Sequence, residues 1–212
     1  MILTRILLDV KNPHTILALG NPNLFHGALE KSVRGTETPL WRVDTLNGNY
    51  YLMVLSKEKL DAEVLTSQFS ESKECVQSVD YNRLLTRLEP GSIWNFRLVA
   101  NPTVSIKTRP HSRERGKVVA CIHEEQQLDW LKKKAEKNGF MFQENQVRIV
   151  GERWIRFKKH KDMPLKKGVC FFSVTFEGIL EVTNVKKFIY ALENGIGKEK
   201  AYGMGLLTVV KI

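Results

Sequence analysis

A chain of 212 residues, 42% hydrophobic and 26% charged, has the length and composition of an ordinary globular protein with one large domain or two small ones. No apolar run approaches the roughly 18 to 20 residues that span a bilayer, so we expect no membrane partner and a cytoplasmic location. The net charge of +10, from 33 Lys and Arg against 23 Asp and Glu, favours a phosphate-rich partner, because clustered basic side chains displace counterions from nucleic acids.

The N-terminal part of the chain predicts the order β-α-β-β-α-β. The helix that contains "NPNLFHGALEKSV" has Asn21 as its expected N-cap and Pro22 at its first helical position. The turn "NGN" between two apolar runs predicts a β-hairpin. In chain order we expect a strand at 2–10, a helix at 21–33, strands at 39–46 and 50–56, a helix at 61–69 and a weak strand at 74–80.

After "LEPG" the same order repeats. We expect a strand at 92–100, a helix at 123–139, long strands at 142–159 and 169–182, a helix at 184–195 and a last strand at 205–212. Two such units predict an α+β protein with two tandem ferredoxin-like domains, 1–87 and 92–212, each a four-stranded antiparallel sheet backed by two helices. RNA-binding modules share this topology, although the topology alone does not fix a function.

Two polar stretches carry clustered positive charge, "KTRPHSRERGK" and "RWIRFKKHK". A solvated basic surface is one interpretation, but two runs in a basic chain favour RNA or DNA. Trp154 and Phe157 lie in the second run, where they could stack on a splayed base or pack in the core. The candidate nucleic-acid contacts in these runs are Arg109, Arg113, Arg115, Lys117, Arg156, Lys158, Lys159 and Lys161.

The segment 195–205, "GIGKEKAYGMG", carries four glycines. It does not match G-x-G-x-x-G, because Lys200 stands where the third glycine belongs, and the Walker pattern fails at Leu192. Both motifs also open a helix, whereas this loop follows one. We interpret the glycines as allowing the backbone to approach a phosphate or a neighbouring helix, with Lys198 and Lys200 supplying charge. A flexible connection is the alternative.

Four stretches together resemble the CasE family of CRISPR repeat-RNA endoribonucleases: "NPNLFHGALEKSV", "FRLVANPTVSIK", "FEGILEV" and "GIGKEKAYGMGLLTVV". They follow the family's order over the whole chain. The resemblance implies two tandem ferredoxin-like domains, binding of the stem-loop in CRISPR repeat transcripts, and cleavage at the base of that stem. It also implies that the enzyme stays with the mature crRNA alongside other subunits of the Cascade complex.

The reaction that this family implies needs no metal or other cofactor. The 2′-hydroxyl attacks the adjacent phosphate and leaves a 2′,3′-cyclic phosphate and a 5′-hydroxyl, so the protein must accept one proton, donate another and stabilise charge on the phosphate. The three cysteines are isolated in sequence, with neither a C-x-x-C pair nor a Cys/His set at zinc spacing, and therefore predict no disulfide framework and no structural metal.

His26 is the candidate for proton transfer, since imidazole has both protonation states available near neutrality. Its helical position is at the margin of the apolar stripe next to Phe25, and a histidine that only packs there is the alternative. Family members often carry a tyrosine three residues earlier, where this chain has Asn23, which can donate a hydrogen bond but cannot exchange a proton. Lys31 is a candidate electrostatic stabiliser or an ordinary solvated lysine.

Two other function classes stay open. A non-catalytic RNA-binding subunit of the same superfamily would bind the hairpin but would tolerate loss of His26. A basic adaptor that assembles with acidic proteins would show no preference for structured RNA.

Overall fold

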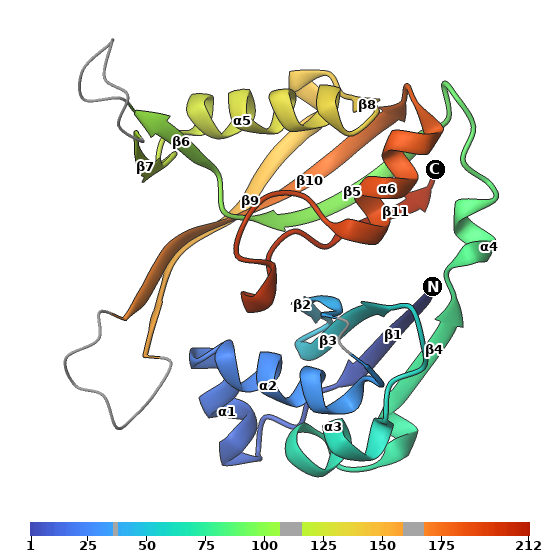
Figure 1. Ribbon diagram of the computed structural model, residues 1–212, viewed down its shortest axis with the longest axis vertical. Coiled ribbons are helices and arrows are strands. Elements are labelled where there is room, and N and C mark those ends of the chain that lie inside the picture. Colours follow the sequence, from blue (N-terminus) through green and yellow to red (C-terminus); the bar gives the residue numbers. More distant parts are fainter. Residues whose placement is uncertain (36–37, 107–115, 159–167) are drawn as a thin grey trace.

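The computed structural model describes residues 1–35, 38–106, 116–158 and 168–212, and shows an N-terminal and a C-terminal half that each contain a sheet with helices against it (Figure 1). In these ranges no helix is long and apolar enough to cross a membrane. Both halves have the expected α+β, ferredoxin-like organisation.

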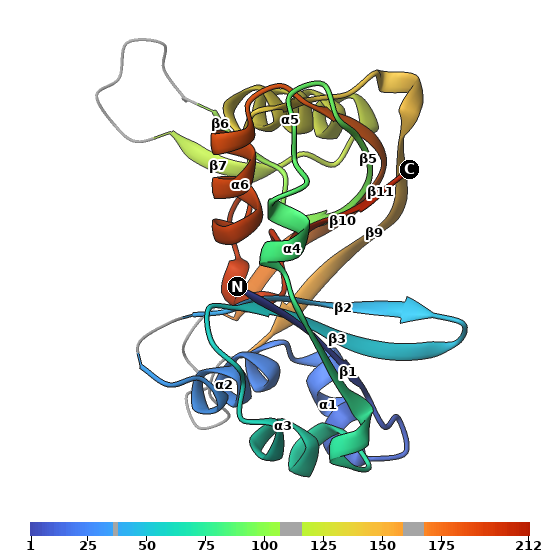
Figure 2. The same cartoon turned by 90° about the vertical axis from the view of Figure 1, so that its right-hand side faces the viewer.

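The N-terminal half has the antiparallel strand order β2-β3-β1-β4, which is the order of a ferredoxin-like β-α-β-β-α-β unit. Its elements are β1 (Ile2–Leu7), α1 (Pro13–Gly20), α2 (Asn23–Ser32), β2 (Leu40–Leu46), β3 (Asn49–Ser56), α3 (Ala62–Phe69) and β4 (Val76–Asp80). The three helices lie on the face of the sheet that is turned away from the C-terminal half (Figure 2). The predicted order of this half is therefore confirmed.

Local sequence signals explain most of these boundaries. The Asn21 side chain accepts a hydrogen bond from the Asn23 backbone N–H at 3.2 Å, as expected for a cap with proline in the first turn. In the "NGN" turn, Asn47 and Gly48 have φ values of 51° and 77°, which are typical of a tight hairpin turn.

Helix α1 is an element that sequence reasoning missed. Asn12 caps this helix by accepting from the His14 N–H at 2.9 Å, and Pro13 occupies its first turn. The His14 ring stacks on Phe69 with 5.3 Å between centroids, so this histidine packs between helices.

The C-terminal half repeats the topology, with strand order β11-β5-β10-β8 and β9 paired with β10. Strands β8 and β9 therefore share the position that a single strand occupies in the N-terminal half. The elements are β5 (Ile93–Ala100), β6 (Thr103–Ile106), β7 (Lys117–Ala120), α5 (Glu124–Lys137), β8 (Phe140–Met141), β9 (Val147–Phe157), β10 (Val169–Val182), α6 (Val185–Asn194) and β11 (Leu207–Lys211).

Two features depart from the predicted scheme. Strands β6 and β7 form a separate antiparallel hairpin between β5 and α5, at the ends of the first basic run. The antiparallel pair β9–β10 continues past its own domain and reaches the level of the N-terminal helices (Figure 1). The C-terminal half therefore extends a two-stranded arm along the junction of the halves.

The hydrophobic core crosses the junction. The larger cluster of buried side chains combines the C-terminal sheet and helices with Leu40 and Leu55 of the N-terminal sheet. It also includes Tyr81, Leu85 and Leu88 from the connecting segment, which contains the short helix α4 (Asn82–Leu85). Apolar burial of this kind holds the two halves against each other.

Candidate functional site

His26 lies on α2 where this helix meets the C-terminal half. The neighbouring Phe25 is buried and packs on Trp41 and Phe69, with ring centroids 5.6 and 4.8 Å away. The His26 side chain keeps 20% of its surface exposed, and its Nε2 lies 3.3 Å from the Glu30 carboxylate one turn further along α2. This is the expected arrangement, in which Phe25 anchors the helix and His26 stays at the margin of the core.

The ring of Tyr202, from the C-terminal half, packs against His26. Its ring meets the imidazole edge-on, with 6.2 Å between centroids and an interplanar angle of 73°. Tyr202 is itself buried and packs against Phe157 at 4.9 Å and Phe171 at 6.1 Å, which belong to the β9–β10 arm. Sequence reasoning missed this residue, although an aromatic side chain inside the glycine-rich segment was the available signal.

The glycine-rich loop brings Tyr202 to this position. Gly195, Gly197, Gly203 and Gly205 all have positive φ, a conformation that other residues rarely adopt. A Cβ on Gly203 would lie 2.9 Å from the ring of Trp41 on β2, and one on Gly197 would lie 3.2 Å from the tryptophan ring of α5. The predicted close approach to a neighbouring helix is therefore found, and the approach to a phosphate stays a prediction.

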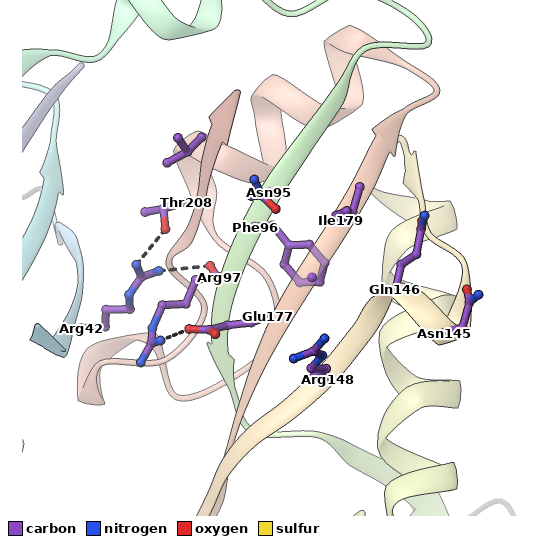
Figure 3. A pocket seen from close by; sticks show the side chains of 12 residues that line it. Arg42, Asn95, Phe96, Arg97, Asn145, Gln146, Arg148, Glu177, Ile179 and Thr208 are labelled. Atoms are coloured by element: carbon purple, nitrogen blue, oxygen red, sulfur yellow. Dashed lines mark hydrogen bonds and ion pairs between the residues drawn. The ribbon is translucent and has the colours of Figure 1, made fainter. Parts of the chain in front are cut away.

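A buried arginine fixes β2 against the C-terminal sheet (Figure 3). Arg42 is 3% exposed and donates hydrogen bonds to the carbonyl oxygens of Leu206 (2.9 Å) and Arg97 (3.1 Å) and to Thr208 Oγ1 (2.7 Å). Its Nε also pairs with Asp44 at 2.8 Å.

The same carboxylate extends the network into the C-terminal sheet. Asp44 accepts a second contact from Arg97 at 3.1 Å, and Arg97 pairs with Glu177 on β10. A cavity of about 660 Å³ opens beside these groups on the face of the C-terminal sheet. The network holds the relative position of α2 and the glycine-rich loop, because both adjoin β2.

The two other residues of the predicted site are placed differently. Asn23 precedes His26 by three residues and lies about 60° from it around the helix, so both occupy the same side of α2. Lys31 follows His26 by five residues and lies about 140° away, in the exposed last turn of α2. Lys31 lines a separate hollow with Arg34 and the residues that precede α3, so the structure does not bring it to His26.

The predicted RNA contacts divide into described and undescribed positions. The undescribed ones are Arg109, Arg113, Arg115, Lys159 and Lys161. Lys117 is exposed at the start of β7, and Arg156 and Lys158 are exposed near the end of β9. Lys198 and Lys200 lie in the glycine-rich loop, between Gly195 and Gly203, which approach Leu40 and Trp41 of β2.

The two aromatic candidates on β9 differ. Trp154 is 50% exposed, with the Phe172 ring 5.1 Å and the Arg156 guanidinium 5.9 Å from its ring centroid, so the exposed part of its ring stays open to a base. Phe157 is 8% exposed and packs on Tyr202, so its alternative role in stacking is not supported. Trp41, Trp94 and Trp130 are buried, as expected for packing residues.

The cysteines Cys75, Cys121 and Cys170 are free thiols. Within the part of the chain that the structure describes, no three His, Cys, Asp or Glu side chains gather into a possible metal site. The metal-independent reaction stays a prediction, for which cleavage in the presence of a chelator is the test.

The chain is similar to known CRISPR proteins. The CRISPR-associated endoribonuclease Cse3 of Thermus thermophilus is 28% identical over 221 residues, covering 99% of each chain. The CRISPR system Cascade subunit CasE of Escherichia coli is 28% identical over 131 residues, 59% of this chain and 62% of the relative. The solved structure of the CRISPR endoribonuclease Cse3 bound to a 19-nucleotide RNA matches with a TM-score of 0.82 at 28% identity, covering 99% of this chain and 100% of that one.

A family model described as CRISPR associated protein matches residues 1–211. The chain therefore belongs to the CRISPR associated protein family, as its resemblance to the CasE-type nucleases predicted.

Proposed function

We propose that this chain is an endoribonuclease that binds the stem-loop of a CRISPR repeat transcript and cleaves it with His26 at the reaction centre. The observation that carries the proposal is the placement of a partly exposed histidine at the junction of two ferredoxin-like domains, held by Glu30 and Tyr202. The similarity to Cse3 over 99% of both chains supports the same assignment.

The imidazole of His26 is the group that the proposal assigns to proton transfer with RNA. In the proposed reaction the 2′-oxygen forms a bond to phosphorus, the bond from phosphorus to the 5′-oxygen breaks, and the 2′-hydroxyl proton leaves while the 5′-oxygen gains one. Glu30 is a positioning residue, because its carboxylate lies 3.3 Å from Nε2 and so orients the imidazole ring. Asn23, on the same side of α2, would donate a hydrogen bond to a phosphate oxygen.

The RNA-binding surface of the proposal is the basic part of the C-terminal half. It combines the β6–β7 hairpin, the β9–β10 arm and the glycine-rich loop, to which the candidate contacts Lys117, Arg156, Lys158, Lys198 and Lys200 belong. An A-form stem is recognised mainly through its shape and backbone, for which exposed basic side chains on strands and loops are suited. We also infer that the product stays bound, that other Cascade subunits join it, and that this takes place in the cytoplasm.

A non-catalytic RNA-binding subunit is the second candidate. Asn23 favours it, because an amide replaces the tyrosine that the CasE resemblance implies at this position, and an amide cannot exchange a proton. The two candidates differ in whether RNA is cut, and not in whether it is bound.

The test is incubation of the purified protein with the repeat RNA of its own host in EDTA, followed by mapping of the ends. Wild type should cut at one position and leave a 2′,3′-cyclic phosphate, and His26→Ala should lose at least about 100-fold in rate while hairpin affinity stays. His123→Ala is the matched control, since His123 is exposed at the start of α5. Tight binding without cleavage by wild type would select the non-catalytic candidate.

A further inference from the structure

Another hollow, of about 400 Å³ and lined by lysines, lies on the helical side of the C-terminal half. Its walls come from the end of β5, the base of the β6–β7 hairpin, the C-terminal turns of α5, helix α6 and the first residues of the glycine-rich loop. Neither the contacts around His26 nor those around Arg42 belong to it. The sequence indicated only its glycine-rich loop with Lys198, because the other residues of the hollow come from separate segments.

Positive charge gathers at this hollow without compensating acids. Lys134, Lys137 and Lys198 line it, and none of its described lining residues is a carboxylate. Among the described residues no ion pair involves these lysines, whereas Lys132 on another face of α5 pairs with Glu144 at 3.7 Å. Burial lowers the pKa of Lys134, and the like charges of three neighbouring lysines lower it further. Such a cluster favours an anion as its occupant.

Asn101 adds a second and different requirement. It is 5% exposed at the end of β5, lines the hollow, and its Oδ1 is buried with no hydrogen-bond partner in the described structure. A buried amide oxygen without a donor costs about 1 to 3 kcal/mol, so a ligand that supplies an N–H or O–H would be stabilised there.

The remaining walls suit a flat group. Tyr190 on α6 is 66% exposed at the rim, where one face of its ring is available for stacking. Gly197 allows the loop backbone to pack against Trp130, because a Cβ at this position would lie 3.2 Å from the tryptophan ring. The ligand that fits this hollow carries an anionic group, a hydrogen-bond donor and a flat ring that can stack on Tyr190. One nucleotide of RNA has all three.

The hollow is connected with His26 through the glycine-rich loop. Lys198 lines the hollow, and Tyr202, four residues later, contacts the His26 ring. Four residues of extended chain span at most about 14 Å, so the two places are within reach of the same RNA strand.

We propose that this hollow is a nucleotide subsite next to the cleavage centre, in which Lys134, Lys137 and Lys198 bind a backbone phosphate and Asn101 Oδ1 accepts a hydrogen bond from the same nucleotide. The donor is either the ribose 2′-hydroxyl or an exocyclic amino group of the base. This inference rests on the proposed function, since it takes repeat RNA as the ligand.

The phosphate contacts are tested by RNA affinity as a function of salt, in a His26→Ala background that prevents cleavage. The Lys134→Ala/Lys137→Ala double variant should weaken binding at least about 10-fold and reduce the slope of log K against log salt by up to about 0.7, the value for one phosphate of single-stranded RNA. Lys132→Ala is the matched control on the same helix and should change neither quantity. Equal effects of the two variants would overturn the phosphate site.

The Asn101 contact is tested first by changing the RNA while Asn101 is kept, so that misfolding of a protein variant cannot mimic the result. Repeat RNAs with one 2′-deoxy nucleotide, or one base that lacks its exocyclic amino group, are measured position by position around the cut. At one position the change in the RNA should weaken binding to the protein by about 5- to 10-fold. The same change in the RNA should not weaken binding to the Asn101→Leu variant further. A 2′-deoxy effect identifies the ribose and an amino-group effect identifies the base.

If no position responds, the subsite is wrong while cleavage by wild type still supports the proposed function. If wild type neither binds nor cuts repeat RNA, the proposed function itself has failed, and the subsite fails with it.

Discussion

Replacement of Arg42 by methionine should weaken the contact between the two halves of the protein and lower the free energy of unfolding. Arg42→Met keeps a side chain of similar length but removes three hydrogen bonds to β5, β11 and the segment before β11, together with the ion pair to Asp44. At about 1.5 kcal/mol for each hydrogen bond from a charged donor, the three cross-domain contacts amount to roughly 4 to 5 kcal/mol. Removal of one partner from a buried ionic network gives a similar figure, about 3 to 5 kcal/mol.

Urea unfolding measures this change. With a slope of about 2 to 3 kcal/mol per molar urea, a loss of this size lowers the midpoint by about 1 to 2 M, and a separate early transition of one half is also expected. Arg83→Met is the control, because Arg83 is exposed on α4, and should stay within about 0.5 kcal/mol of wild type. Equal midpoints for the two variants would refute the role given to Arg42 at the junction.

Three further outcomes follow from the same structure. Gly203→Ala combines φ +81° with a clash against a tryptophan ring of β2, so it should lower stability in thermal unfolding by about 2 to 3 kcal/mol and reduce the rate of RNA cleavage. Gly35→Ala has positive φ but open space around it, so it should lower stability by only about 1 kcal/mol. Phe157→Ala should lose about 3 kcal/mol of stability, whereas Trp154→Ala should leave stability nearly unchanged and weaken RNA binding if its ring stacks on a base. Burial raises the pKa of the Cys121 thiol, so at about pH 8 this thiol should react with a thiol reagent only on unfolding, and rapid labelling of native protein would contradict its placement.

The elements with strong local signals were predicted well. The hydrogen bond to the Asn21 side chain and the "NGN" turn each depend on residues close in sequence, so the structure reproduces them. Helix α1 was missed although its cap was present, because the short segment 13–20 shows no long apolar period and follows a predicted strand directly. The β6–β7 hairpin was missed because a basic, polar run separates its short strands.

The site shows the same division. His26 was identified through a helix whose apolar stripe and family-like residues are local, and its position at the margin of the core follows from helical geometry. Lys31 satisfied the same local reasoning, yet it projects to another side of the helix. Glu30 went unnoticed although its i,i+4 spacing from His26 on the predicted helix was a local signal for this contact.

Periodicity, caps, turns and charge are properties of neighbouring residues, so they sufficed to predict the two β-α-β-β-α-β units, the basic character of the chain and the helix that carries His26. The contact of Tyr202 with His26, the hydrogen bonds of Arg42 across the halves and the place of Asn101 beside a lysine-lined hollow are visible in the folded chain alone. Such contacts join distant residues, as in the hydrogen bond from Arg42 to a carbonyl 164 positions later in the chain. They form because apolar burial and left-handed glycines bring distant segments together, which no local pattern encodes.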